Sequence, residues 1–190
     1  MTKNIMIVGV GGQGTLLASR IVGAAALRAG KQVKLSEVHG MSQRGGSVVT
    51  YVRYGEAVAS PIIEEGEADM ILAFELLEAL RVLPFLKEGG KMLVNRQKID
   101  PMPVITGAAE YPNGAEAELT EKANALVLDA LSLAKTAGNA KAVNVVLIGA
   151  LAKATDIPYD KWTDAIRNTV PEKFLESNLK AFALGYEGGN

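Results

Sequence analysis

Short continuous runs of apolar residues recur through the first half of the chain and predict strands that are buried on both faces of a sheet. These runs cover residues 5–8 and 69–74, and residues 33–38 and 92–95 are two further strand candidates. Between them, residues 15–29 and 75–85 carry apolar residues at helical spacing, and these segments end near Gly30 and Pro84. The order strand, helix, strand thus occurs twice and predicts right-handed parallel crossovers.

An antiparallel element is expected to interrupt this order. Residues 48–53 alternate and are rich in Val, Thr and Tyr, Tyr54-Gly55-Glu56 reads as a turn, and residues 57–59 are expected to return as a strand. A further short strand is expected at residues 104–105. The pattern therefore predicts an α/β fold with a mixed, mostly parallel sheet.

From Gly114 onward the pattern becomes helical. Helices are expected over residues 115–137, 142–153, 159–168 and 172–184, and the sequence TVPE (residues 169–172) resembles a capping box with proline at the first helical position. No flexible linker precedes this part. We therefore expect one domain over residues 1–190, with a helical part from about residue 114.

Composition and charge exclude several classes of protein. The chain has 190 residues, of which 48% are hydrophobic and 22% charged, so it can form a sizeable core. Twenty Lys and Arg residues against 21 Asp and Glu residues argue against nucleic-acid binding. No apolar run is long enough to span a membrane, and the first residues lack the pattern of a signal peptide, so a cytoplasmic protein is expected.

The absence of cysteine narrows the possible chemistry further. Without cysteine the chain cannot hold a disulfide, a cysteine nucleophile or a cysteine-ligated iron–sulfur cluster, and His39 is its only histidine. We therefore expect no catalytic residue and no metal site in this chain. Six acidic residues lack the spacing of metal ligands and are expected on a solvated face: Glu64, Glu65, Glu67, Asp69, Glu75 and Glu78. Trp162 is expected in the core or on a surface where helices pack.

A first glycine loop follows the first predicted strand. The sequence GVGGQG (residues 9–14) has the G-x-G-x-x-G spacing, which lets the backbone approach an anion at the start of the next helix. The candidate cofactor-binding residues are Gly9, Gly11, Gly12, Gln13, Gly14 and Thr15. Three interpretations remain open: a dinucleotide site, for which Glu37 falls late as the ribose-binding acid, a turn that only allows tight packing, or contact with another anion or a partner segment.

A second, polar glycine loop follows the next parallel strand. It contains the candidate residues His39, Ser42, Gln43, Arg44, Gly45 and Gly46, which are assigned to a substrate or subunit interface. Because carboxyl ends of parallel strands share one edge of the sheet, the two loops are expected side by side. Arg44 offers a bidentate grip on a phosphate or carboxylate. The alternative is that Glu37, His39 and Arg44 only satisfy one another and the loop carbonyls.

These two loops carry a family resemblance. The segments IMIVGVGGQGTLL (residues 5–17) and EVHGMSQRGGSVVTY (residues 37–51) resemble the gamma-type module of 2-oxoacid:ferredoxin oxidoreductases. ADMILAFELLEALRVLPFL and GGKMLVN, further along, also fit this module. The stand-alone chain with HGMSQRGG is most similar to the small (beta) subunit of the indolepyruvate ferredoxin oxidoreductases.

The resemblance implies a three-layer, Rossmann-like α/β domain and a role in an assembly. Such assemblies oxidatively decarboxylate a 2-oxoacid, here indolepyruvate or another arylpyruvate, to an acyl-CoA with coenzyme A, while ferredoxin is reduced. A large partner subunit is expected to hold thiamine diphosphate, magnesium and the iron–sulfur clusters, which makes the protein a hetero-oligomer. The resemblance gives neither His39 nor Arg44 a role in proton transfer.

Two other functions compete with this one. The first is a self-sufficient dinucleotide-binding oxidoreductase or a regulatory nucleotide-binding module, which the first glycine loop alone would suit. The second is a structural adaptor, in which both glycine loops contact only protein.

Overall fold

The computed structural model describes residues 2–40 and 45–189 and contains a six-stranded mixed sheet in the order β2-β3-β1-β4-β5-β6. The strands are β1 (Lys3–Val10), β2 (Gln32–His39), β3 (Ser47–Gly55), β4 (Ala68–Ala73), β5 (Leu86–Asn95) and β6 (Leu126–Leu128). β1, β4, β5 and β6 run parallel to one another, whereas β3 is antiparallel to both β1 and β2. The predicted mixed, mostly parallel sheet is confirmed.

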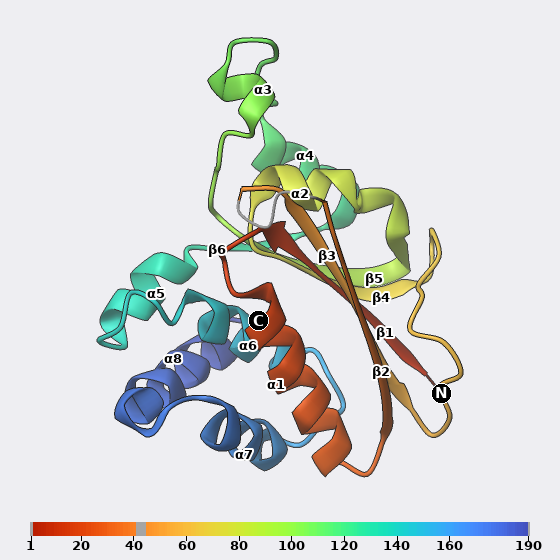
Figure 1. Cartoon of the computed structure of the whole chain (residues 1–190), viewed down its shortest axis with the longest axis vertical. Coiled ribbons are helices and arrows are strands. Elements are labelled where there is room, and N and C mark those ends of the chain that lie inside the picture. Colours follow the sequence, from red (N-terminus) through yellow and green to blue (C-terminus); the bar gives the residue numbers. More distant parts are fainter. Residues whose placement is uncertain (1, 41–44, 190) are drawn as a thin grey trace.

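Helices cover both faces of this sheet and complete a three-layer α/β fold (Figure 1). α1 and α5 to α8 lie on one face, and α2 and α4 lie on the other (Figure 1). The helices are α1 (Thr15–Arg28), α2 (Leu76–Arg81), α3 (Met102–Ile105), α4 (Ala115–Ala123), α5 (Ala130–Thr136), α6 (Val143–Lys153), α7 (Tyr159–Thr169) and α8 (Leu175–Gly188), with 3-10 turns at Leu83–Phe85 and Glu172–Phe174. No helix in the described ranges is both long and apolar enough to cross a membrane.

The side chains of β1 alternate between two hydrophobic cores. Ile5 and Ile7 pack with α1 and the C-terminal helices, including the fully buried Trp162, which confirms its predicted place in the core. Met6 and Val8 point to the other face, where α2 and α4 cover them. Every side chain from Ile5 to Val8 is therefore buried, which explains why this strand reads as an unbroken apolar run.

The first crossover differs from the expected arrangement in one respect. β2 runs in the same direction as β1, but β3 lies between them and pairs with both along its length, from Val10↔Ser47 to Lys3↔Tyr54 on the β1 side. The returning strand predicted at residues 57–59 is wrong. Arg53 instead holds this part of the chain by donating to the carbonyl oxygens of Ser60 and Ile62.

Two other expected elements are wrong. The helix expected over residues 115–137 is interrupted, because Asn124 adopts a left-handed conformation (φ 46°) and the next residues pair with the end of β5 as the edge strand β6. The strand expected at residues 104–105 is part of the helical turn α3. Its geometry is fixed by Pro101, whose carbonyl oxygen accepts from the N–H groups of Val104 and Ile105.

The predicted capping box before the last helix is also wrong. Thr169 Oγ1 donates to the carbonyl oxygen of Ala165 at 2.7 Å and so belongs to α7. Residues 172–174 form a 3-10 turn, and α8 begins only at Leu175 without a side-chain cap. The helix expected over residues 172–184 is thus confirmed in type but starts later.

Candidate functional site

The two glycine loops meet at the carboxyl edge of the sheet, as predicted. Gly11 donates its N–H to the carbonyl oxygen of Gly46 at 2.8 Å, and Gly45 donates to the carbonyl oxygen of Gly11 at 3.2 Å. The pair of bonds continues the ladder between β1 and β3 into the loops. Ser42, Gln43 and Arg44 lie outside the described residues, so their assignment stays a prediction.

Packing accounts for part of the first glycine loop. A side chain at Gly9 would come within 2.9 Å of Phe74 Cβ and 2.8 Å of Gln13 Oε1, so glycine allows β1, β4 and the loop to approach closely. Gly14 directly precedes α1 with a left-handed φ of 88°, which favours glycine. Gly12 is exposed, and Thr15 is buried at the first position of α1.

The start of α1 has the properties of an anion-binding helix end. Its first turn carries no side-chain cap, so its free N–H groups are not satisfied by a neighbouring side chain. The helix has 14 residues, and its N-terminus points toward the edge of the sheet where the loops meet (Figure 1). These N–H groups and the helix dipole together favour a phosphate or carboxylate at this place.

The Gln13 side chain is committed to the protein's own backbone. Its Oε1 accepts from the N–H of Val10 at 2.7 Å, and its Nε2 donates to the carbonyl oxygen of Phe74 at 3.0 Å and to Gln97 Oε1 at 3.1 Å. One amide therefore joins the carboxyl ends of β1 and β4 to the segment after β5. Gln13 shapes the loop, and its amide is not directed at a ligand.

A cavity of about 550 Å³ opens beside the second loop. Gly45, Gly46 and Ser47 line it, as do Glu78 and Arg81 of α2. Residues 99–103 and 105, which include α3, also line it and supply mostly apolar side chains. The cavity lining therefore combines polar and apolar groups, as the lining of ligand sites usually does.

Two carboxylates beneath this cavity correct the sequence interpretation. Glu75 and Glu78 were expected on a solvated face, but they are only 1% and 5% exposed. The reason is that α2 follows β4 directly, so that its first turn packs against the ends of the strands and the segment after β5. Glu78 accepts a hydrogen bond from Ser47 Oγ and lies 3.7 Å from Arg81 Nε.

Glu78 is expected to make the stability of the protein pH-dependent. Burial raises the pKa of the Glu78 carboxyl, although the Ser47 hydrogen bond and Arg81 oppose this shift. A raised folded-state pKa contributes stability below the unfolded-state pKa, and this contribution is lost as the pH rises through the folded-state value. Glu78→Gln should therefore become more stable relative to the wild type as the pH rises from 4 to 8.

Urea unfolding at several pH values measures this difference. Glu65→Gln, which neutralises an exposed carboxylate, serves as the control for loss of a negative charge. A Glu78→Gln difference that stays constant from pH 4 to pH 8 would contradict the assignment.

His39 and Glu37 lie on the exposed edge strand β2. His39 Nδ1 is 3.0 Å from the carbonyl oxygen of Gly40, and among the described residues His39 does not line the cavity. Glu37 Oε2 accepts from Thr50 Oγ1 at 3.3 Å. Because β3 separates β2 from β1, Glu37 does not stand beside the first loop as the ribose-binding acid of a dinucleotide fold does.

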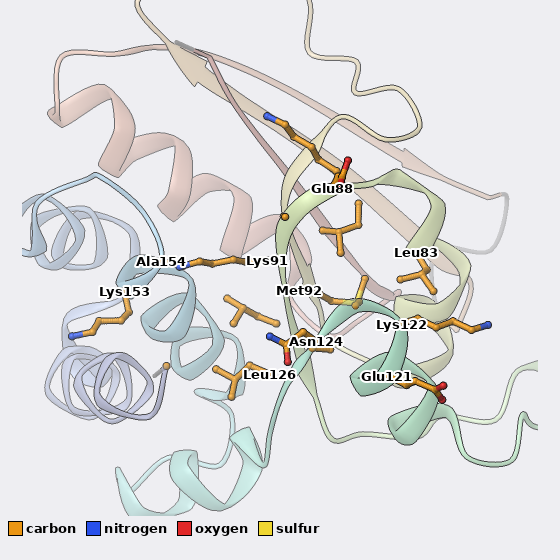
Figure 2. Close-up of a pocket in the computed structure, with 18 residues that line it drawn as sticks. Leu83, Glu88, Lys91, Met92, Glu121, Lys122, Asn124, Leu126, Lys153 and Ala154 are labelled. Carbon is orange, nitrogen blue, oxygen red and sulfur yellow. The ribbon is translucent and has the colours of Figure 1, made fainter.

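A larger cavity, of about 1110 Å³, lies at the amino ends of β5 and β6 (Figure 2). Lys91, Lys153, Glu88 and Glu121 mix both charges around it, and the described residues of the glycine loops do not line it. Within the described ranges no group of three or more His, Asp and Glu residues is placed to hold a metal ion. The 550 Å³ cavity and the paired loops are therefore the better candidate site.

Comparisons with known proteins agree with the sequence motifs. Residues 4–188 match the family model described as pyruvate ferredoxin/flavodoxin oxidoreductase. Indolepyruvate oxidoreductase subunit IorB of Thermococcus kodakarensis is 47% identical, with 96% of this chain and 93% of the relative covered. The pyruvate/ketoisovalerate oxidoreductases common subunit gamma of Thermococcus litoralis is 30% identical, with 94% and 92% covered.

Solved structures show the same fold. The gamma subunit of a keto/oxoacid ferredoxin oxidoreductase from Geobacter sulfurreducens superimposes with a TM-score of 0.74 at 27% identity over 98% of both chains. A 2-oxoglutarate:ferredoxin oxidoreductase from Magnetococcus marinus matches 99% of this chain with 31% of its own length, at a TM-score of 0.73 and 21% identity. Given the family match over nearly its whole length, this chain belongs to the pyruvate ferredoxin/flavodoxin oxidoreductase family.

Proposed function

We propose that this chain is the small subunit of a 2-oxoacid:ferredoxin oxidoreductase whose substrate is indolepyruvate or a related arylpyruvate. The observation that carries the choice of substrate class is the 47% identity to an indolepyruvate oxidoreductase subunit of nearly the same length, against 30% to a pyruvate/ketoisovalerate subunit. The assembled enzyme converts the 2-oxoacid and coenzyme A into an acyl-CoA and carbon dioxide, and ferredoxin takes up the electrons.

The chemistry is divided between subunits in this proposal. The chain has no cysteine to hold a cluster, and its described residues offer no acidic or histidine metal site. Thiamine diphosphate, magnesium and iron–sulfur clusters are assigned to a larger partner, and ferredoxin docks on the complex. The hetero-oligomer is assigned to the cytoplasm. Residues 1–190 act as one domain, a proposal supported by the core that β1 shares with α6, α7 and α8.

The glycine loops are assigned to binding rather than to catalysis. Gly9, Gly11, Gly12, Gln13, Gly14 and Thr15 form the loop that offers main-chain donors at the start of α1 to an anionic group, for which the phosphates of coenzyme A are the candidate. His39, Ser42, Gln43, Arg44, Gly45 and Gly46 are assigned to the neighbouring interface with substrate or partner. The hydrogen bonds between Gly11, Gly45 and Gly46 support a single site made from both loops.

Reconstitution tests the proposed function. The tagged chain, used anaerobically to capture proteins from its source lysate, should retain a large brown subunit that contains thiamine diphosphate. The complex should reduce a viologen dye only when a 2-oxoacid and coenzyme A are both present, and its kcat/KM with indolepyruvate should be at least about tenfold above that with pyruvate. The chain alone should be inactive because it brings no redox group.

Two results would contradict this function. One is dye reduction by the purified chain alone with added thiamine diphosphate. The other is tight binding of NAD in calorimetry, weakened by Glu37→Ala, which would favour the dinucleotide-binding alternative.

A further inference from the structure

Residues 98–111 form an arm that projects from the body of the protein and carries α3 (Figure 1). Within it, Met102 and Ile105 are 64% and 66% exposed. The same two side chains line the 550 Å³ cavity, which Gly45 and Gly46 also line. The arm therefore forms part of the boundary of the cavity.

Both ends of the arm are fastened to one buried carboxylate. Glu75 Oε1 accepts from the N–H of Ile99 at 3.0 Å and from the hydroxyl of Tyr111 at 2.5 Å. The Tyr111 hydroxyl oxygen in turn accepts from the N–H of Leu77 at 3.0 Å. Because the carboxylate is almost fully buried, these bonds are shielded from water and hold the arm firmly.

The other oxygen of Glu75 fixes α2, which also lines the cavity. Oε2 accepts from the N–H of Glu78 at 2.9 Å and so caps α2. Glu78 itself accepts from Ser47, which begins β3 directly after Gly45 and Gly46. Glu75 is thus linked to two parts of the cavity lining. It binds the arm directly, and it is connected to the residues beside Gly45 and Gly46 through α2, whose Glu78 accepts from Ser47.

We infer that Glu75, with Tyr111, is a positioning residue that holds the arm across from the second glycine loop at the distance at which the cavity accepts coenzyme A. This inference rests on the proposed function, which brings coenzyme A to the glycine loops. Glu75 acts through the arm and α2 and does not itself line the cavity. Loosening the arm is therefore expected to weaken binding of the co-substrate and to leave the chemical step unchanged.

Tyr111→Phe tests the fastening without adding bulk or charge. Hydrogen exchange of the Ile99 amide should become at least about tenfold faster in the full-length chain, because the arm loses a hydrogen bond to a buried carboxylate. The Asn4 amide, which donates to Asp69 Oδ2 at 2.9 Å, should exchange at the wild-type rate.

Tyr54→Phe is the matched control. The Tyr54 hydroxyl is also buried and donates to a carboxylate, Asp156 Oδ1, at 2.9 Å, but it lies near the other end of β3, where that strand pairs with the start of β1. This variant loses the same kind of bond, and exchange at Ile99 should not change. A faster Ile99 amide in both variants would mean a general loss of stability and would overturn the inference.

Kinetics of the reconstituted complex give the second measurement. Tyr111→Phe should raise the KM for coenzyme A about fivefold with kcat within about twofold of the wild type, whereas Tyr54→Phe should leave the KM unchanged. Ile105→Ser changes an exposed side chain that lines the cavity. It should raise the KM for coenzyme A without changing hydrogen exchange at the Ile99 amide. This variant tests the cavity lining even if Tyr111→Phe folds poorly.

The outcomes separate the inference from the proposed function. An unchanged KM for coenzyme A in both Tyr111→Phe and Ile105→Ser would overturn the inference while the proposed function stands. A wild-type complex without coenzyme A-dependent activity would refute the proposed function and this role of the cavity together. An Ile99 amide that exchanges at the wild-type rate in Tyr111→Phe would show that Tyr111 does not hold the arm to Glu75, and it would overturn the inference whatever the activity.

Discussion

Gly185→Ala is expected to destabilise the protein by about 3 kcal/mol or more, or to abolish its cooperative unfolding. At Gly185 a methyl group would overlap the carbonyl oxygen of Val146 and lie 2.7 Å from the carbonyl carbon of the same residue. A methyl group at Gly149 would likewise lie 2.7 Å from the backbone nitrogen of Tyr186 in α8. The backbones of α6 and α8 therefore touch, and neither can move aside without opening the core.

Urea unfolding of Gly185→Ala and of Gly188→Ala measures this effect. Gly188 ends the same helix, but a methyl group there would approach only Leu133 Cδ1, at 4.0 Å. Gly188→Ala should therefore be neutral or stabilising by a few tenths of a kcal/mol, because alanine favours the helix. A Gly185→Ala free energy of unfolding within about 0.5 kcal/mol of the wild type would show that the helices do not pack at this distance.

Gln13→Glu is expected to cost about 3 kcal/mol at pH 8 and much less near pH 4. The substitution keeps the size of the side chain and the oxygen that accepts from Val10. It replaces the donating Nε2 by an oxygen that faces the carbonyl oxygen of Phe74 and Gln97 Oε1. The folded state then favours the protonated acid, so the pKa of the new carboxyl rises above the value of about 4.3 in the unfolded chain.

The sign of the pH effect follows from this shift. Below about pH 4.3 the new carboxyl is protonated in both states, and it still donates one hydrogen bond. As the pH rises toward the raised folded-state pKa, the unfolded chain releases the proton more easily, and the variant loses stability relative to the wild type. Urea unfolding from pH 4 to pH 8 should show the difference widening over this range.

Gln97→Glu is the matched control for added charge at the same place. Gln97 Oε1 only accepts hydrogen bonds, from Gln13 and Asn95, and a carboxylate oxygen accepts them equally well. This variant should stay within about 1 kcal/mol of the wild type at pH 8. If both variants lose stability equally, charge and not the lost donor explains the effect.

The sequence predicted the strands and helices whose burial is uniform. β1 and β4 are buried on both faces, so their apolar runs identify them, and α6 is apolar all round for the same reason. β6 could not be predicted, because Leu126–Leu128 is a short apolar stretch whose strand conformation depends on pairing with the end of β5. The helix-favouring residues around it hide the break at Asn124.

The candidate site was predicted in position but not in its internal connections. The rule that ligands lie at carboxyl ends of parallel strands placed the two glycine loops together correctly. Glu75 was missed because its partners, Ile99 and Tyr111, lie 24 and 36 residues away along the chain. The only local signal was an acidic residue at the start of a helix, which most often reports a cap and nothing more.

The arm also has a consequence for engineering. Because the Ile99 N–H and the Tyr111 hydroxyl donate to the same oxygen of Glu75, the backbone ends of the arm are separated by no more than a tyrosine side chain and two hydrogen bonds, although eleven residues lie between them. A replacement turn of about four residues is long enough to join these ends. The segment between Ile99 and Tyr111 is therefore a natural graft site, where a peptide tag or a binding loop can replace α3 with little entropic cost to the rest of the fold.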